Sequence, residues 1–271
     1  MNKVIEIELH GFASLHDKID FTLSVYICSN FSMTGACVST NHPTFCNPTI
    51  NEALCEIHFS LPEGIEWEPS VYGKFFTLIQ NEFPLIEPIV GPNIRMRYRH
   101  QARPLLFQLS EDLLTINLLA KYPGWKQMKQ DILSGWSWLR EIIGPAEPAR
   151  IGLRYINFVP VDNEIEKLED WFAPNDYIAN AVLRARPSSS RVELQMADQI
   201  KAIIQVGEIT NLINPNERKF LLDIDAITFA HADNAPTLAE AITILHDNVI
   251  WRIFDSFRTT KLDTLLNRQD L

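Results

Sequence analysis

The chain of 271 residues is 46% hydrophobic and 21% charged, which is typical of a globular protein with a packed core and excludes a disordered or fibrous one. Its formal net charge of −10 repels phosphate backbones, so nucleic acid is not an expected partner. The sequence has neither an apolar run long enough to span a membrane nor, in residues 1–30, the pattern of a secretory signal.

The four cysteines give no sign of a metal or redox motif. They are Cys28, Cys37, Cys46 and Cys55, and no two of them have the close spacing of a zinc knuckle or a redox pair. A disulfide framework would need an oxidising compartment, and nothing in the sequence directs the chain to one. We therefore expect a reduced, soluble, cytoplasmic protein without a bound metal.

Residues 1–46 are predicted to be an N-terminal extension that is weakly docked or disordered. Within it, residues 4–9 and 21–27 alternate like short strands, and residues 29–48 are rich in the Pro, Gly, Asn and Ser of loops. The pattern becomes stronger from Asn47 onward, and we expect residues 47–271 to form a single domain.

The predicted domain begins with a strand over residues 48–59, PTINEALCEIHF, in which Ala53, Cys55, Ile57 and Phe59 alternate with charged or titratable residues. Two mid-chain helices follow from apolar residues at helical spacing. They are predicted over residues 70–83 and 124–144. The other predicted strands cover residues 94–100, 104–109, 113–120, 149–161, 191–197, 200–209 and 219–229, with a short acidic helix over 164–172.

A long C-terminal helix is predicted from Thr237, where Thr237 and Glu240 form a capping box, and a kink or restart is expected at residues 258–260. Most connections between the predicted strands are short, and short connections favour antiparallel pairs. The predicted fold class is therefore α+β, with a largely antiparallel sheet of seven or more strands packed by the two mid-chain helices and the long C-terminal helix.

Five segments carry a family resemblance when taken in order. They are NPTINEALCEIHF, FTLIQNEFP, LFQLSEDLLTINLLAKYPGW, RIGLRYINFV and LHDNVIWRIFDSF. This set resembles a sporadically distributed, uncharacterised family of bacterial and archaeal proteins of about 250 residues. The resemblance covers residues 47–266, about four fifths of the chain. It implies a prokaryotic origin and a cytosolic setting, and it implies no catalytic residues.

Three of the predicted strands carry charged side chains on one face. These side chains are Glu52, Glu56, His58, Arg95, Arg97, Arg99 and Arg154. One interpretation is a solvated face with cross-strand ion pairs, each stabilising the sheet by about 0.2–1 kcal/mol. The alternative is a concave site in which arginines bind carboxylate or phosphate groups. The candidate ligand-binding residues are Glu56, His58, Arg97, Arg99 and Arg154.

The C-terminal helix is apolar over more than one stripe, because Ile250, Trp251, Ile253 and Phe254 wrap around it. A helix of this kind is either central or contacts a partner, and exposed apolar patches mark interaction sites. Trp251 and Phe254 are therefore the candidate partner-binding residues.

No local signature of catalysis is present. The sequence has no phosphate loop, no dinucleotide-binding glycine motif, no zinc-protease motif and no nucleophile elbow, and its seven histidines are scattered. We therefore expect a non-catalytic cytosolic protein, without cofactor, that recognises a protein partner as an accessory component in stress, defence or toxin–antitoxin biology. The alternative is a sensor or enzyme for a small anionic ligand on the charged sheet face. The sequence predicts no particular oligomeric state.

Overall fold

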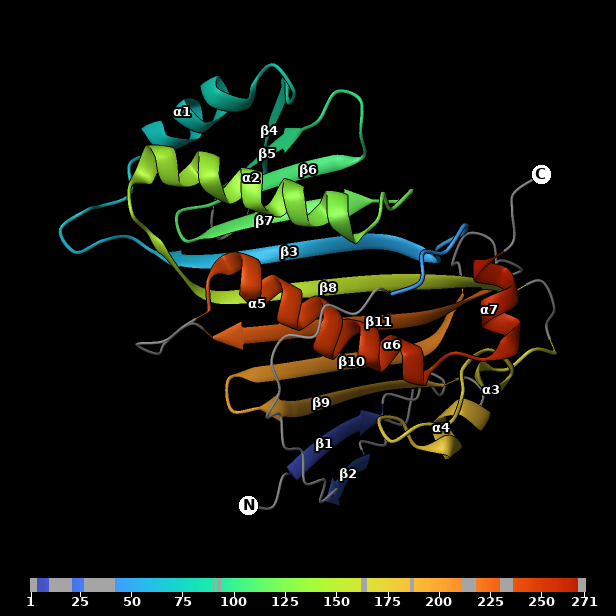
Figure 1. Cartoon of the computed structure of the whole chain (residues 1–271). Coiled ribbons are helices and arrows are strands. Elements are labelled where there is room, and N and C mark those ends of the chain that lie inside the picture. The colour runs from blue at the N-terminus through green and yellow to red at the C-terminus, as the bar shows by residue number, and fades with distance from the viewer. Residues whose placement is uncertain are drawn as a thin grey trace. The chain divides into compact units, whose positions relative to one another are not determined.

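A computed structural model describes residues 4–9, 21–26, 42–89, 91, 94–161, 165–185, 188–210, 218–229 and 236–267 (Figure 1). The chain forms two compact units. Unit 1 comprises Met1–Ile50, Tyr155–Ala226 and His246–Leu271, and unit 2 comprises Asn51–Arg154 and Ile227–Leu245. The predicted boundary at residue 47 and the predicted single domain stay predictions.

The strands of unit 2 follow the alternation in the sequence. β3 (Ile50–Ser60), β7 (Leu113–Leu119), β6 (Leu105–Leu109), β5 (Arg95–Arg99) and β4 (Leu85–Ile89) are neighbours in that order. Each of these neighbouring pairs is antiparallel. β8 (Glu147–Val161) flanks β3 on its other side, and its residues after Arg154 belong to unit 1.

Strand β4 is absent from the prediction, and it contains a proline, Pro88. Proline cannot donate a backbone hydrogen bond to a neighbouring strand, so a proline in a run of residues usually argues against a central strand. Among the strands that the structure describes, β4 is an edge strand paired with β5, and Pro88 lies opposite Met96. An edge strand has one side without a neighbouring strand, where the missing N–H of a proline breaks no hydrogen bond. A proline is therefore compatible with this strand.

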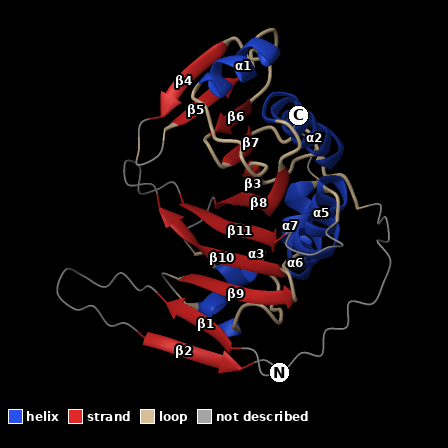
Figure 2. Cartoon of the chain, turned by 90° about the vertical axis from the view of Figure 1, so that its left-hand side faces the viewer, coloured by secondary structure: helices blue, strands red, loops and turns tan. Residues whose placement is uncertain are grey.

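One face of the unit 2 strands carries the core. Cys55 and Ile57 of β3 are fully buried and Phe59 is almost so, which confirms the predicted direction of the alternation. Helices α1 (Ser70–Ile79) and α2 (Trp125–Ile143) lie on this face (Figure 2). α1 contributes Phe75, whose ring contacts those of Tyr98 and Phe107 at centroid distances of 5.1 Å and 6.2 Å. The mid-chain helices are therefore confirmed, with the first ending four residues before the predicted Phe83.

Unit 1 contains the strands predicted in the second half of the chain. β9 (Ser189–Ala197), β10 (Ile200–Thr210) and β11 (Arg218–Phe229) are neighbours in that order, and β8 follows β11. On the other side of β9 lie β1 (Val4–Leu9) and then β2 (Phe21–Tyr26), at the positions predicted within the extension. The β2–β1, β1–β9 and β9–β10 pairs are antiparallel.

The short helices of unit 1 differ in part from the prediction. The predicted acidic helix is present as α3 (Leu168–Trp171), whereas α4 (Asn180–Arg184) was not predicted. α3 is held against the end of the chain, since Thr259 donates its hydroxyl to the Trp171 carbonyl at 2.9 Å. Taken together, the strands and helices make this an α+β protein.

The C-terminal helix begins as predicted, but it is not regular. Thr237 accepts a hydrogen bond from the Glu240 backbone and donates one to its side chain, so the capping box is confirmed. The chain then runs through α5 (Leu238–Ile244), a π-helical segment at Leu245–Ile250, and α6 (Trp251–Ser256). It restarts as α7 (Thr260–Leu266), which confirms the predicted break. Among the described residues, no helix is both long and apolar enough to cross a membrane.

The close approach of α2 to the sheet generates a stability prediction. A side chain at Gly135 would meet the Phe107 ring at 3.2 Å and Ile116 at 3.6 Å. Gly135→Leu should therefore lower the free energy of unfolding by about 2 kcal/mol through overpacking, measured by urea denaturation. The control is Gly73→Ala on α1, where nothing lies within 4 Å, and where alanine should raise the free energy by up to about 1 kcal/mol. Equal effects at the two positions would contradict this packing.

Candidate functional site

The strands of unit 2 carry polar side chains on the face opposite α1 and α2. We call this the polar face, and it is formed by Glu52, Glu56, His58, Glu87, Arg95, Arg97, Arg99, Gln108, Thr115, Asn117, Arg150 and Arg154. It exists because the side chains of a strand point alternately to its two faces. Because the side chains on one face of the strands form the core, the side chains on the other face lie together on the opposite side of the sheet.

Strand register places several of these side chains in one row. Across the sheet, Glu87 is opposite Arg97, Arg97 is opposite Gln108, Gln108 is opposite Thr115, and Thr115 is opposite Glu56. Neighbouring members are therefore about 5 Å apart at their backbones.

Ion pairs and amide hydrogen bonds satisfy much of the polar face from within. At one end of the row Glu87 lies 3.5 Å from Arg97 and 3.8 Å from Arg99. Beside the row, Gln108 donates to the Asn117 side chain at 3.1 Å, and Asn117 in turn donates to Glu52. A network of this kind fixes the orientation of each side-chain amide. Once the oxygen of Asn117 accepts from Gln108, its NH₂ group must point toward Glu52.

Two atoms of the row are left without a partner. The side-chain oxygen of Thr115 and the Nε of Arg97 are both buried and make no hydrogen bond to the described residues. Thr115 is only 4% exposed. A buried polar atom without a hydrogen bond costs about 1–3 kcal/mol, so such atoms in a native structure need an explanation.

The structure places the predicted ligand-binding residues on one face of the strands, but their side chains do not all contact one another. Glu56 and Arg97 belong to the same row with Thr115 and Gln108 between them. Arg99 pairs with Glu87, and the outward positions of β8 place Arg154 on the same face as Arg150.

His58 lies at the margin of this group of charges. Burial lowers the pKa of its imidazole below the ordinary value, and the charge of Arg150 lowers it further. The ring is therefore a neutral donor and acceptor at physiological pH.

Sequence reasoning missed five members of the polar face: Glu87, Gln108, Thr115, Asn117 and Arg150. In the segment LLFQLSEDLLTINLL the signal was present, since Gln108, Thr115 and Asn117 interrupt apolar runs at alternating positions. Arg150 lies 3.5 Å from Glu56 and forms the ion pair expected between neighbouring strands.

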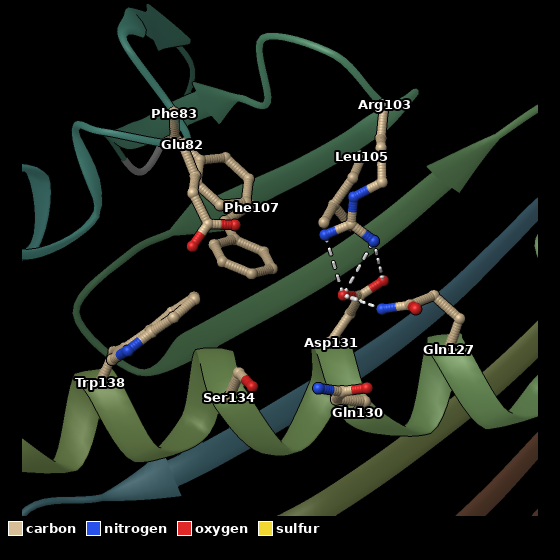
Figure 3. A pocket seen from close by; sticks show the side chains of 10 residues that line it. All are labelled: Glu82, Phe83, Arg103, Leu105, Phe107, Gln127, Gln130, Asp131, Ser134 and Trp138. Atoms are coloured by element: carbon tan, nitrogen blue, oxygen red, sulfur yellow. Dashed lines mark hydrogen bonds and ion pairs between the residues drawn. The ribbon is translucent and has the colours of Figure 1, made fainter.

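A cavity of about 350 Å³ lies on the opposite side of unit 2, between α2, β6 and the turn after α1 (Figure 3). Its lining residues are Glu82, Phe83, Arg103, Leu105, Phe107, Gln127, Gln130, Asp131, Ser134 and Trp138. Arg103 donates three hydrogen bonds of 2.9–3.1 Å to the Asp131 carboxylate, and Gln127 donates a fourth at 3.1 Å. The charges of Arg103 and Asp131 therefore neutralise each other, which leaves neither of them available to a ligand and makes the cavity a weaker ligand site than the polar face.

The candidate partner-binding residues contact the chain itself. The Trp251 ring stacks on His42 at a centroid distance of 4.4 Å and on Phe45 at 5.9 Å, and the Phe254 ring contacts Phe45 at 6.1 Å. Both side chains keep an intermediate exposure. Residues 42–45 belong to the predicted extension, so part of that segment is docked on α6. A partner surface at Trp251 and Phe254 stays a prediction.

Comparison with known proteins does not extend this picture: no protein-family model matches the chain, and no curated protein is significantly similar to it. The resemblance to the sporadically distributed bacterial and archaeal family therefore stays a prediction.

The pair of Arg103 and Asp131 should be worth more than an exposed ion pair. Asp131→Asn should lower the free energy of unfolding by about 2 kcal/mol, because Asp131 is buried and its hydrogen bonds are charge-assisted. Glu87→Gln, which breaks a half-exposed pair, should cost less than about 1 kcal/mol. A double-mutant cycle of Asp131→Asn with Arg103→Met measures the coupling directly. Additive effects would contradict the pairing.

The aromatic contacts of Trp251 predict a structural contribution from that residue. Trp251→Ala should lower the free energy of unfolding by about 1–2 kcal/mol, less than for a fully buried tryptophan. Trp251→Phe should recover most of this loss, because a ring remains to stack on His42. Urea denaturation of the three proteins tests this. If Trp251→Ala is as stable as the native chain, the stack contributes nothing and the tryptophan is available to a partner.

Proposed function

We propose that this chain is a non-catalytic binding protein of the prokaryotic cytosol whose polar face takes up a small anionic ligand. The single observation that carries the proposal is the unsatisfied pair of atoms in the row, the Thr115 hydroxyl and the Arg97 Nε. Both can donate a hydrogen bond, and both lie on a face where the remaining groups hold them in fixed positions. An oxygen-rich ligand would supply the missing acceptors.

Charge supports an anionic ligand. The polar face carries five arginines and three glutamates, although the whole chain has a net charge of −10. Arginine suits this role, because its guanidinium stays charged and presents several donors in a plane that matches carboxylate and phosphate groups. A local excess of positive charge in an acidic protein attracts anions to this face in preference to the rest of the surface.

The spacing of the two unsatisfied atoms limits the ligand. Thr115 and Arg97 are on strands separated by β6, so their backbones are about 10 Å apart. A single oxygen atom does not bridge that distance, even though the arginine side chain is long. The ligand therefore has the size of a metabolite and carries more than one acceptor group, as dicarboxylates, tricarboxylates and nucleotides do.

Recognition of a protein partner through Trp251 and Phe254 is the second candidate function. It is favoured by the intermediate exposure that both side chains keep after residues 42–45 have docked on them. A partner would add to this aromatic cluster, where Phe45 already lies 5.5 Å from the guanidinium of Arg258.

A ligand screen with matched variants tests the first proposal. The purified chain is titrated with inorganic phosphate, nucleotides, and di- and tricarboxylates while its melting temperature is followed. A true ligand at 100 times its dissociation constant should add about 2.7 kcal/mol to the free energy of unfolding. A panel in which no compound raises the melting temperature would contradict the proposal.

Thr115→Val separates binding from folding. The variant removes a buried hydroxyl that has no partner, so the free protein should be as stable as the native chain or more stable by about 1 kcal/mol. Binding of the ligand found in the screen should nevertheless weaken at least tenfold, and Arg97→Gln should weaken it too. Arg191→Gln on β9, which breaks an exposed ion pair with Glu193, is the control and should leave binding unchanged. Unaltered binding by Thr115→Val would remove the basis for this site.

A further inference from the structure

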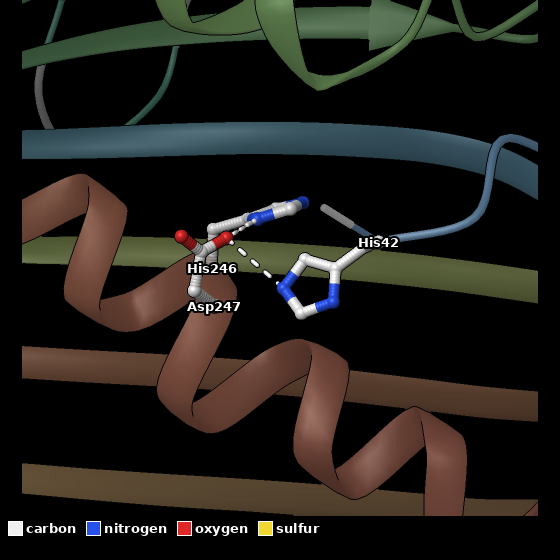
Figure 4. A group of neighbouring side chains, drawn as sticks. All are labelled: His42, His246 and Asp247. Carbon is white, nitrogen blue, oxygen red and sulfur yellow. Dashed lines mark hydrogen bonds and ion pairs between the residues drawn. The ribbon is translucent and has the colours of Figure 1, made fainter. Parts of the chain in front are cut away.

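Three potential metal ligands from distant parts of the chain meet in unit 1 (Figure 4). His42 comes from the segment before β3, and His246 and Asp247 come from the π-helical segment. Oδ1 of Asp247 lies 2.6 Å from Nδ1 of His246 and 3.2 Å from Nε2 of His42. The three donor atoms all lie within 4.8 Å of one another.

The local backbone explains why two of these donors are adjacent in the sequence. In a regular α-helix, consecutive side chains point in directions about 100° apart and do not face each other. His246 and Asp247 instead lie in a π-helical stretch, where the helix is wider, and their side chains meet. Such π-helical interruptions are rare and are found frequently at functional sites.

The surroundings hold the cluster in place and shield it. The side chains of His42, His246 and Asp247 are only 14%, 10% and 9% exposed. Trp251 stacks on the His42 ring with a 29° angle between the planes, and the Tyr155 ring lies 6.1 Å from that of His246. The ring planes are therefore restricted by packing before any ion binds, so little side-chain freedom remains to be lost on binding.

We propose that His42, His246 and Asp247 form a binding site for a divalent transition-metal ion, with Zn²⁺ as the best fit. Two imidazole nitrogens and a carboxylate oxygen are ligands that Zn²⁺ accepts in sites with three protein ligands and one open position. Mg²⁺ and Ca²⁺ prefer oxygen ligands alone, so the two histidines select against them. This site goes beyond the proposed function and does not depend on it, because all three ligands lie in unit 1 and the polar face lies in unit 2.

The charge state of the cluster suits a cation. The Asp247 carboxylate brings a negative charge to the two imidazole rings, and its Oδ1 lies within hydrogen-bonding distance of a nitrogen of each ring. In the metal-free form it holds both rings through one oxygen atom, and a bound cation takes over that role.

A metal ion at this site would also attach residues 42–49 to the rest of unit 1. His42 lies in the predicted extension, whereas the other two ligands are some 200 positions later in the chain. A metal ion would cross-link these segments and add to the hydrogen bond between the Asn47 backbone and the Leu266 carbonyl at 2.9 Å. Zinc binding should therefore stabilise unit 1 against unfolding.

The test uses the full chain, freed of any affinity tag and stripped with a chelator. Titration with Co²⁺ should give the visible absorption bands of a four- or five-coordinate site and reach one equivalent per chain, and Zn²⁺ should displace the cobalt. Zn²⁺ should also raise the melting temperature. A native chain that shows neither the cobalt bands nor heat of Zn²⁺ binding in calorimetry would overturn the proposal.

Variants at His42 distinguish ligation from packing. His42→Phe keeps a ring to stack on Trp251 but has no ligand atom, so its fold should survive while its affinity for Zn²⁺ falls by more than about 100-fold, beyond the loss expected for an outer contact. His42→Cys supplies a thiolate and should retain binding. Asp247→Asn should also weaken binding, whereas Glu193→Gln, which removes an exposed carboxylate on β9 outside the cluster, should not. If His42→Phe binds Zn²⁺ as tightly as the native chain, the site is not formed by these residues.

Discussion

The two-residue period of strand β3 is the constraint on which unit 2 depends. Its inward side chains, among them Cys55 and Ile57, are fully buried on the face of the strands that carries α1 and α2. The outward side chains, including Glu52 and Glu56, are mostly polar and must find partners across the neighbouring strands. A shift of register by one residue would exchange the two sets, burying charges and exposing the core. The polar face is therefore a direct consequence of how the core is built.

The polar face and the cavity differ in how completely their polar groups are satisfied. In the cavity, Asp131 accepts bonds from both Arg103 and Gln127, so its buried charge is compensated within the chain. On the polar face, the ion pairs are longer and two buried donor atoms have no acceptor. Because an unsatisfied buried group costs free energy that a ligand can recover, the face with the less complete network is the better binding site.

At the π-helical segment of the C-terminal helix, the final structure differs from the regular α-helix that the local sequence predicts. The capping box at Thr237 starts the helix, and apolar residues continue the stripe beyond it. At Leu245–Ile250 the helix widens, and the two side chains that follow Leu245 meet His42 from the far end of the chain. Helical propensity does not favour a π-helical turn over an α-helical one. The stabilisation must therefore come from tertiary contacts such as the stacking of Trp251 on His42. The cluster and the polar face belong to separate units, and each stands on its own contacts.

Local patterns in the sequence determined the α+β class, the antiparallel hairpin of β6 and β7, the two mid-chain helices and the start of the C-terminal helix, because periodicity and capping act within a few residues. The same alternation placed Glu52, Glu56 and His58 on one face of their strand, and Arg95, Arg97 and Arg99 on one face of theirs. Strand order and register were decided only by the tertiary structure, and so were the row through Thr115, the edge position that accommodates Pro88, and the meeting of His42 with His246 and Asp247. These features depend on contacts between residues far apart in the chain, for which one sequence carries no local signal.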